Sequence, residues 1–159
     1  MAYGEAQPEE SRIVLIGVGN KYRGDDAAGL IAVQRLRQRL GNRVVCREES
    51  GEGAALIEAW KGAKTVILVD ATCSGAPPGT LHRFDVAAQP LPATLLCYST
   101  HAFGVAEAIE LARTLGQLPA RFIVYGIEGE NFTAGSELSA EAKRAVEEAI
   151  LWVQQELEH

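Results

Sequence analysis

The sequence predicts an α/β domain built on an open, largely parallel β-sheet. Two short runs, residues 13–16 and 65–69, are continuously apolar and rich in β-branched side chains, as expected for strands buried on both faces of a sheet. A glycine-containing turn follows the first run, and residues 26–40 then place apolar side chains at helical spacing. The turn therefore lies at the carboxyl edge of the sheet, where open α/β folds bind ligands.

Length and charge favour a single domain that acts on neither nucleic acid nor membranes. We expect residues 1–11 to form a disordered tail and residues 12–159 to form one α/β domain, because a chain of 159 residues buries about two thirds of its unfolded surface. The net charge of −6, without a cluster of Lys and Arg, argues against nucleic acid and anionic membranes as partners. No predicted helix shows a second apolar face, so we expect a monomer.

Two features indicate a cytoplasmic location. No apolar run approaches the roughly 20 residues that span a bilayer, and the first dozen residues lack the charged and apolar regions of a signal peptide. The three cysteines, Cys46, Cys73 and Cys97, are widely spaced and form no C-x-x-C pair. An odd number at such spacings predicts reduced structural thiols rather than a zinc site.

The turn after the first strand carries two adjacent carboxylates. Tyr22 stands where a dinucleotide-binding motif has its third glycine, and Asp25 and Asp26 stand where a phosphate loop has Lys and Ser or Thr. Two carboxylates at a helix N-terminus would repel a phosphate placed there. Asp25 is a candidate N-cap, Asp26 is a candidate functional residue, and Gly29 lets the helix lie close to the sheet.

The middle of the chain adds two strands, a short helix and an acidic loop. Residues 43–46 predict a second strand, a short helix is expected over residues 54–60, and the third strand ends at Asp70. The segment 48–53 (EESGEG) is acidic and rich in glycine. Two interpretations of it stay open: a solvated connection, or a loop that gates the substrate.

The next segment predicts an edge strand and a long connection. Residues 80–84 alternate as an edge strand does, which makes His82 a surface histidine. Residues 85–98 contain Pro90 and Pro92 and show no period, so they are a candidate lid or docking surface.

The last third of the chain predicts a helix, a strand and a final helix. Ser99 is a candidate N-cap, which puts His101 in the first turn of a helix. The positive end of the helix dipole would keep this imidazole neutral, the form that ligates metal. Residues 121–127 predict another strand, and Ser139 is expected to cap an amphipathic final helix.

Asp26, Asp70 and His101 are expected to face one crevice of the open sheet. Two carboxylates and one imidazole make an incomplete ligand set for a transition metal such as Ni, Zn, Fe or Cu, with positions left for water or a partner. The same three groups without a metal could activate water by general base catalysis. A nucleophilic Ser or Cys is not supported, because no G-x-S-x-G motif is present.

Three ordered motifs, GVGNKYRGDDAAG, VDATCSGAPPGT and STHAFGVAE, resemble those of the hydrogenase maturation endopeptidases, which process the large subunit of nickel–iron hydrogenases. The resemblance covers about residues 12–157 and identifies residues 12–159 as a protease domain. It implies a three-layer α/β/α fold with a five-stranded mixed, mostly parallel sheet of order 2-1-3-5-4, in which strand 4 is antiparallel. It also implies an aspartic-type endopeptidase that removes a C-terminal extension of the precursor after nickel insertion.

The resemblance assigns both catalytic and metal-contacting roles to Asp26, Asp70 and His101. The nickel would be carried by the substrate, with the hydrogenase large-subunit precursor as the partner. Whether the metal polarises the scissile carbonyl or a carboxylate activates water stays open. The acidic loop replaces the family's usual D-G-G-T, and we expect Glu49, Gly51, Glu52 and Gly53 to contact the precursor.

Two other functions remain as alternatives at this point. The first is a Rossmann-like module that binds a nucleotide or another cofactor at the turn between Gly17 and Gly24. The second is a nickel-sensing chaperone that binds the nickel-loaded precursor without cutting it. Titration with nucleotides tests the first, and the presence or absence of a shortened product tests the second.

Overall fold

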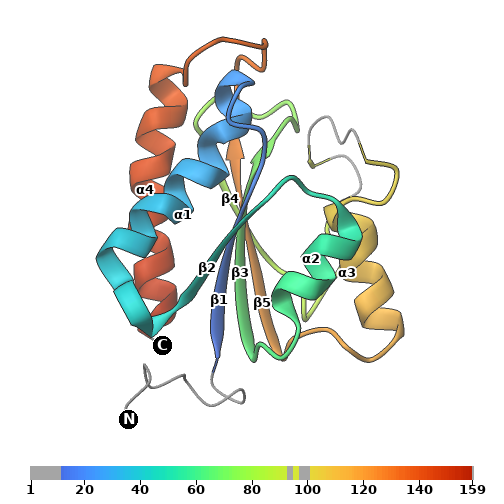
Figure 1. Ribbon diagram of the computed structural model, residues 1–159. Helices are drawn as coiled ribbons and strands as arrows, with labels where there is room; N and C mark the ends of the chain where they lie inside the picture. Colours follow the sequence, from blue (N-terminus) through green and yellow to red (C-terminus); the bar gives the residue numbers. More distant parts are fainter. Residues whose placement is uncertain (1–11, 93–94, 97–100, 159) are drawn as a thin grey trace.

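The computed structural model describes residues 12–92, 95–96 and 101–158 (Figure 1). The predicted disordered tail lies outside these residues. In chain order the elements are β1 (Ile13–Val18), the 3₁₀ turn η2 (Gly24–Ala27), α1 (Ala28–Leu40), the 3₁₀ turn η3 (Gly41–Arg43), β2 (Val45–Glu49), α2 (Gly53–Trp60), β3 (Thr65–Thr72), β4 (Leu81–Asp85), α3 (Val105–Thr114), β5 (Arg121–Glu128) and α4 (Ala140–Leu157).

The strands form one sheet in the order β2-β1-β3-β5-β4. Strands β2, β1, β3 and β5 are parallel, and β4 runs antiparallel to β5. The expected order and the antiparallel fourth strand are therefore confirmed. Because the parallel strands are in register, Gly17 near the end of β1 pairs with Glu48 of β2 and with Val69 of β3. The carboxyl ends of these three strands meet at one edge of the sheet.

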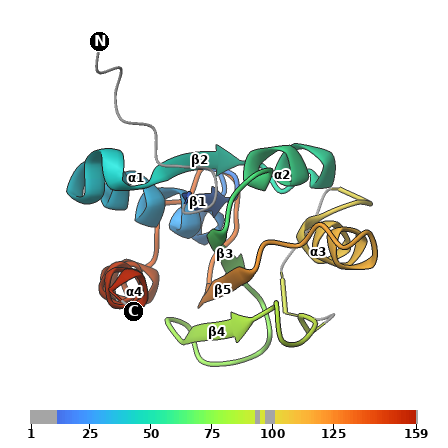
Figure 2. The same cartoon turned by 90° about the horizontal axis from the view of Figure 1, so that it is seen from below.

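Helices cover both faces of the sheet and create two separate cores. Figures 1 and 2 show α1 and α4 on one face and α2 and α3 on the other. Successive side chains of a strand point to opposite faces. Leu15 and Ile67 accordingly pack in the core beneath α1 and α4, whereas Val14 and Leu68 pack in the core beneath α2 and α3. Both faces of β1 and β3 are buried, which explains why their sequences are continuously apolar.

Close contact between α1 and β3 fixes the turn that precedes α1. A Cβ atom added to Gly29 would lie 2.2 Å from the backbone oxygen of Val69, so only glycine fits there. The prediction that Gly29 allows close packing is confirmed. This contact holds η2, and with it Asp26, next to the end of β3.

Two expectations about individual side chains are wrong. Cys73 is disulfide-bonded, while Cys46 is a free thiol, so the predicted reduced state does not hold for Cys73. Spacing along the sequence does not indicate which distant cysteines a fold brings together. His82 is not a surface residue: its side chain is 19% exposed, and its Nε2 atom lies 3.1 Å from the buried carboxylate of Glu128.

In the described part of the chain, no helix has the length and apolar character needed to cross a membrane.

Candidate active site

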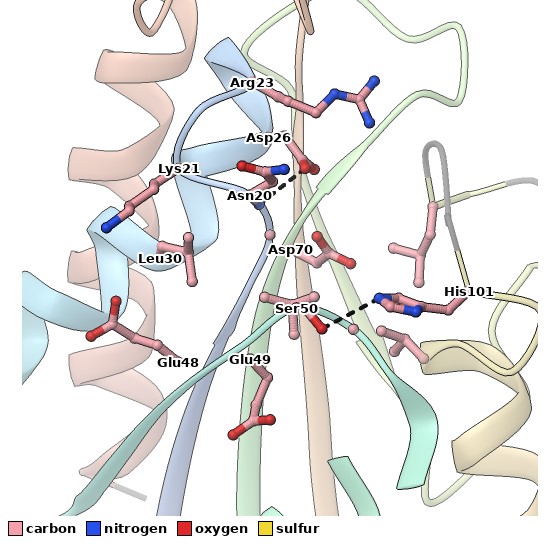
Figure 3. Close-up of a pocket in the computed structure, with 15 residues that line it drawn as sticks. Asn20, Lys21, Arg23, Asp26, Leu30, Glu48, Glu49, Ser50, Asp70 and His101 are labelled. Atoms are coloured by element: carbon pink, nitrogen blue, oxygen red, sulfur yellow. Dashed lines mark hydrogen bonds between the residues drawn. The ribbon is translucent and has the colours of Figure 1, made fainter. Parts of the chain in front are cut away.

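A cavity of about 360 Å³ opens at the carboxyl edge of the sheet (Figure 3). Its walls come from the β1–η2 turn, the end of β3, the β2–α2 loop and the segment before α3. Asp26, Asp70 and His101 all line it. Figure 3 shows the two carboxylates on one side of the cavity and His101 reaching in from the other. The structure thus brings the three predicted site residues to one place.

Asp26 is held by the turn that it follows. The backbone N–H of Asn20 donates a hydrogen bond of 3.0 Å to its Oδ2 atom. Burial raises the pKa of Asp26, while this hydrogen bond and the charge of Arg23 lower it, and the net direction is upward. Gly19 allows the turn to wrap closely, because a Cβ atom there would lie 1.9 Å from the backbone oxygen of Asp26.

Asp70 lies within β3, and only 7% of its surface is exposed. Its Oδ1 atom accepts a hydrogen bond of 2.8 Å from the backbone N–H of Ala71. Burial raises the pKa of Asp70 well above its ordinary value, and the negative charge of Asp26 raises it further. The two carboxyl groups therefore interact, and the cavity favours a protonated Asp70 beside Asp26.

His101 lies outside any helix, which corrects the predicted position in a first helical turn. Helix α3 begins at Val105, and the backbone N–H of Gly104 donates a hydrogen bond of 2.9 Å to the side chain of Glu107. The expected N-cap, Ser99, falls outside the described residues. The dipole argument for a neutral His101 consequently does not apply. The Nε2 atom of His101 lies 3.3 Å from the hydroxyl oxygen of Ser50, in the β2–α2 loop.

The acidic loop divides into cavity residues and structural residues. Glu49 and Gly51 line the cavity, whereas Glu52 and Gly53 do not. Glu52 instead caps α2, accepting hydrogen bonds of 2.9 Å from the backbone N–H groups of Ala54 and Ala55, which lower its pKa.

Glu49 lines the cavity and has a raised pKa. Burial raises the pKa of Glu49, with a smaller opposing effect from Arg47 and a smaller supporting one from Glu52. Figure 3 shows its side chain pointing away from Asp26 and Asp70. Glu48 also lines the cavity, and its carboxylate accepts a hydrogen bond of 2.8 Å from Gln34 of α1.

Asp25 is a buried anchor and not the N-cap that the sequence suggests. Its carboxylate accepts hydrogen bonds from the backbone N–H groups of Glu130 (2.7 Å), Asn131 (3.1 Å) and Ser139 (2.7 Å) and from the Ser139 hydroxyl (2.8 Å). Burial alone would raise the pKa of Asp25, but these hydrogen bonds together outweigh it and lower the pKa. Asp25 therefore fixes the turn in place, and Asp26 is the carboxylate presented to the cavity.

Sequence reasoning missed five polar residues that line the cavity: Asn20, Lys21, Arg23, Glu48 and Ser50. Asn20 had a detectable signal, because an asparagine directly after the glycine turn often hydrogen-bonds the backbone two residues later. Its Oδ1 atom does accept a hydrogen bond of 2.9 Å from the backbone N–H of Tyr22. Ser50 and the two cations had no comparable signal.

The described residues contain no group of three or more His, Cys, Asp or Glu side chains arranged to hold a metal ion. What the cavity holds is a pair of interacting carboxyl groups with raised pKa values and an imidazole on the opposite wall. Such a set is suited to general acid–base chemistry.

Comparisons with known proteins identify the family. A family model described as hydrogenase maturation protease (HycI) matches residues 34–156, a range that includes Asp70 and His101. The chain is 31% identical over 141 residues to the hydrogenase expression/formation protein HoxM of Cupriavidus necator, covering 87% of this chain and 70% of HoxM. It is also 31% identical over 144 residues to the putative hydrogenase maturation protease MJ0253 of Methanocaldococcus jannaschii, covering 87% of this chain and 91% of that protein.

A solved structure agrees with these sequence matches. The hydrogenase maturating endopeptidase HybD from E. coli superposes with a TM-score of 0.79 at 25% identity, covering 92% of both chains. The fold, the family model and the sequence matches lead to one assignment: the chain belongs to the hydrogenase maturation protease family.

Proposed function

We propose that this protein is an endopeptidase that removes the C-terminal extension of a nickel–iron hydrogenase large-subunit precursor after nickel has been inserted. The observation that carries the proposal is the cavity in which Asp26, Asp70 and His101 meet. Membership of the hydrogenase maturation protease family supports the reaction class. We further propose that it acts in the cytoplasm as a monomer.

The carboxyl pair supports an aspartic-type mechanism. The environment of Asp70 favours its protonated form, which can donate a hydrogen bond and then a proton to the scissile carbonyl oxygen. Ionised Asp26 accepts a proton from water, and the water oxygen bonds to the carbonyl carbon. Collapse of this tetrahedral intermediate breaks the C–N bond. The proton held by Asp26 passes to the leaving amine, and the proton on the former carbonyl oxygen returns to Asp70.

Nickel enters this proposal as part of the substrate. Carboxylate and imidazole groups are suitable ligands for nickel, so Asp26, Asp70 and His101 are the residues that would contact it through open coordination positions. A carboxylate bound to a metal is less available as a base. Comparing the cleavage rates of nickel-loaded and nickel-free precursors tests whether the metal is required for recognition.

The acidic loop is proposed to contact the precursor through Glu49 and Gly51, the two expected contact residues that line the cavity. Glu52 and Gly53 would act by holding the loop. Replacing Glu49 with Lys should raise KM for the precursor. Glu58→Lys, which makes the same change of charge on the exposed face of α2, is the matched control.

The main experiment mixes purified protein with nickel-loaded precursor and measures the shortened product by mass spectrometry. We expect Asp26→Asn, Asp70→Asn and His101→Ala each to reduce the cleavage rate by at least about 10²-fold while the variants stay folded, because each removes a group that acts in the reaction. Glu58→Gln serves as a remote carboxylate control and should cleave normally.

Three outcomes would count against the proposal. Normal cleavage by folded Asp70→Asn would exclude the carboxyl-pair mechanism. Equal cleavage of precursor stripped of nickel by a chelator would remove the metal from recognition. Stable binding of the loaded precursor without any shortened product would instead favour a nickel-sensing chaperone.

A further inference from the structure

The β2–α2 loop contacts the His101 segment at two points. The first is the side chain of His101, whose Nε2 atom lies 3.3 Å from the hydroxyl oxygen of Ser50. The hydroxyl can donate or accept in this contact, depending on which ring nitrogen carries the proton. Figure 3 shows this contact between the loop and the imidazole at the cavity.

The second contact holds the backbone and the neighbouring aromatic ring. The backbone N–H of Gly53 donates a hydrogen bond of 2.8 Å to the backbone oxygen of Phe103. The Phe103 ring lies directly against Gly53, where an added Cβ atom would come within 2.6 Å of the ring. Phe103 also packs against the core beneath α2 and α3. A glycine at position 53 therefore lets the aromatic ring seat against the loop.

The loop is itself held by the start of α2. Glu52 accepts hydrogen bonds from two backbone N–H groups of that helix, and these lower its pKa. Ser50 and Gly53 flank this cap on either side. The start of α2, which Glu52 caps, therefore helps to hold Ser50 and Gly53 in place.

This arrangement matters because no helix fixes His101. The residue precedes α3, so a misplacement of the segment 101–104 would move the imidazole relative to Asp26 and Asp70. Small errors in the placement of a reacting group cost large factors in rate. The contacts of Ser50 and Gly53 are the means by which the neighbouring loop holds this segment.

We infer that Ser50 and Gly53 are positioning residues for His101: Ser50 orients the imidazole, and Gly53 seats Phe103 and the backbone that carries it. The inference rests on the proposed function, in which His101 acts on the substrate. It gives the loop a role in the rate of the reaction, in addition to the contact with the precursor proposed above.

The test measures processing of nickel-loaded precursor together with the NMR resonances of the His101 ring nitrogens at one fixed pH. Ser50→Ala should lower kcat about 5-fold with KM nearly unchanged, and should shift the His101 resonances, because one hydrogen bond to the ring is lost. Ser50→Thr, which keeps the hydroxyl, should restore most of kcat. Thr114→Ala removes a hydroxyl that bonds the backbone oxygen of Glu110 on exposed α3, and should change neither readout.

Gly53→Ala tests the second contact. The added methyl group must displace the Phe103 ring, so kcat should fall by at least about 10-fold, and the two substitutions combined should lose less than the product of their separate effects because both act through one segment. Thermal unfolding of each variant reports whether the fold is retained. If Gly53→Ala does not fold, Ser50→Ala and its NMR signature still decide the matter.

The outcomes separate this inference from the proposed function. An inactive His101→Ala, together with wild-type kcat and unchanged His101 resonances in both Ser50→Ala and Gly53→Ala, overturns the positioning role alone. Wild-type processing by His101→Ala overturns the proposed role of His101 and the positioning role with it. Reduced kcat with shifted resonances supports the inference.

Discussion

Removal of the Asp25 carboxylate should destabilise the protein far more than removal of its neighbour, Asp26. Asp25 is completely buried and accepts four hydrogen bonds that connect the β1–η2 turn to the segment after β5 and to the start of α4. In Asp25→Ala, three backbone N–H groups lose their acceptor. Breaking a buried, charged hydrogen-bond network of this kind costs about 3–5 kcal/mol.

Chemical denaturation measures the loss of unfolding free energy, and thermal unfolding measures the corresponding fall in Tm. For a domain of this size, a loss of about 3–5 kcal/mol lowers Tm by on the order of 10 °C. Asp26→Asn is the matched control: it removes an adjacent carboxylate charge but keeps the shape of the side chain, and it should change the unfolding free energy by less than about 1 kcal/mol. The denaturant slope should stay the same, because the surface exposed on unfolding does not change.

The pH dependence gives a second, independent readout. The pKa of Asp25 is lowered in the folded state, so its contribution to stability is fully present above its unfolded value near 3.8 and is lost as pH falls through the lower folded value. Asp25→Ala should therefore lose most stability at neutral pH and approach the wild type in strong acid. A loss below about 1 kcal/mol at pH 7 would refute the anchoring role of Asp25.

Three further predictions concern other parts of the fold. Burial raises the pKa of Asp70 in the folded state, so above about pH 4 Asp70 ionises in the unfolded chain while the folded protein keeps it protonated. This difference destabilises the wild type as pH rises. In urea denaturation, Asp70→Asn should therefore gain stability relative to wild type over that range. Gly29→Ala should cost about 1–3 kcal/mol in the same assay, since its methyl group meets the backbone oxygen of Val69; an unchanged midpoint would show that α1 can move away. Glu156 has its pKa lowered to about 2, chiefly by the Arg83 guanidinium, so Glu156→Gln should be less stable than wild type at neutral pH, with the gap closing as pH falls from about 4.5 towards 2; a gap independent of pH would contradict this.

The parts of the fold that could be predicted from the sequence are those fixed by local pattern. Strands β1 and β3 are buried on both faces, so their apolar runs identify them without knowledge of their partners. Asp26 and Asp70 follow from the same pattern, because Asp70 stands at the carboxyl end of a predicted strand and Asp26 in the turn that follows another. Their placement in one cavity then follows from the parallel arrangement of the sheet.

The parts that could not be predicted depend on contacts between distant residues. The role of Asp25 depends on donors about 105 to 114 positions further along the chain. The half-buried position of His82 depends on its contact with Glu128, which belongs to another strand. The start of α3 was misplaced because hydroxyl residues before His101 look like a cap, whereas the backbone of Gly104 and the side chain of Glu107 form the actual helix start.

Within the described residues, strand β2 forms one edge of the sheet and pairs only with β1. The loop at its carboxyl end therefore leaves from the periphery of the sheet, whereas Asp26 and Asp70 are attached to its central strands. Insertions or charge changes in this loop need not disturb the packing that holds the carboxyl pair. Variation in this loop is thus physically separable from the placement of the two carboxyl groups, but changes at Ser50 or Gly53 would also reach His101.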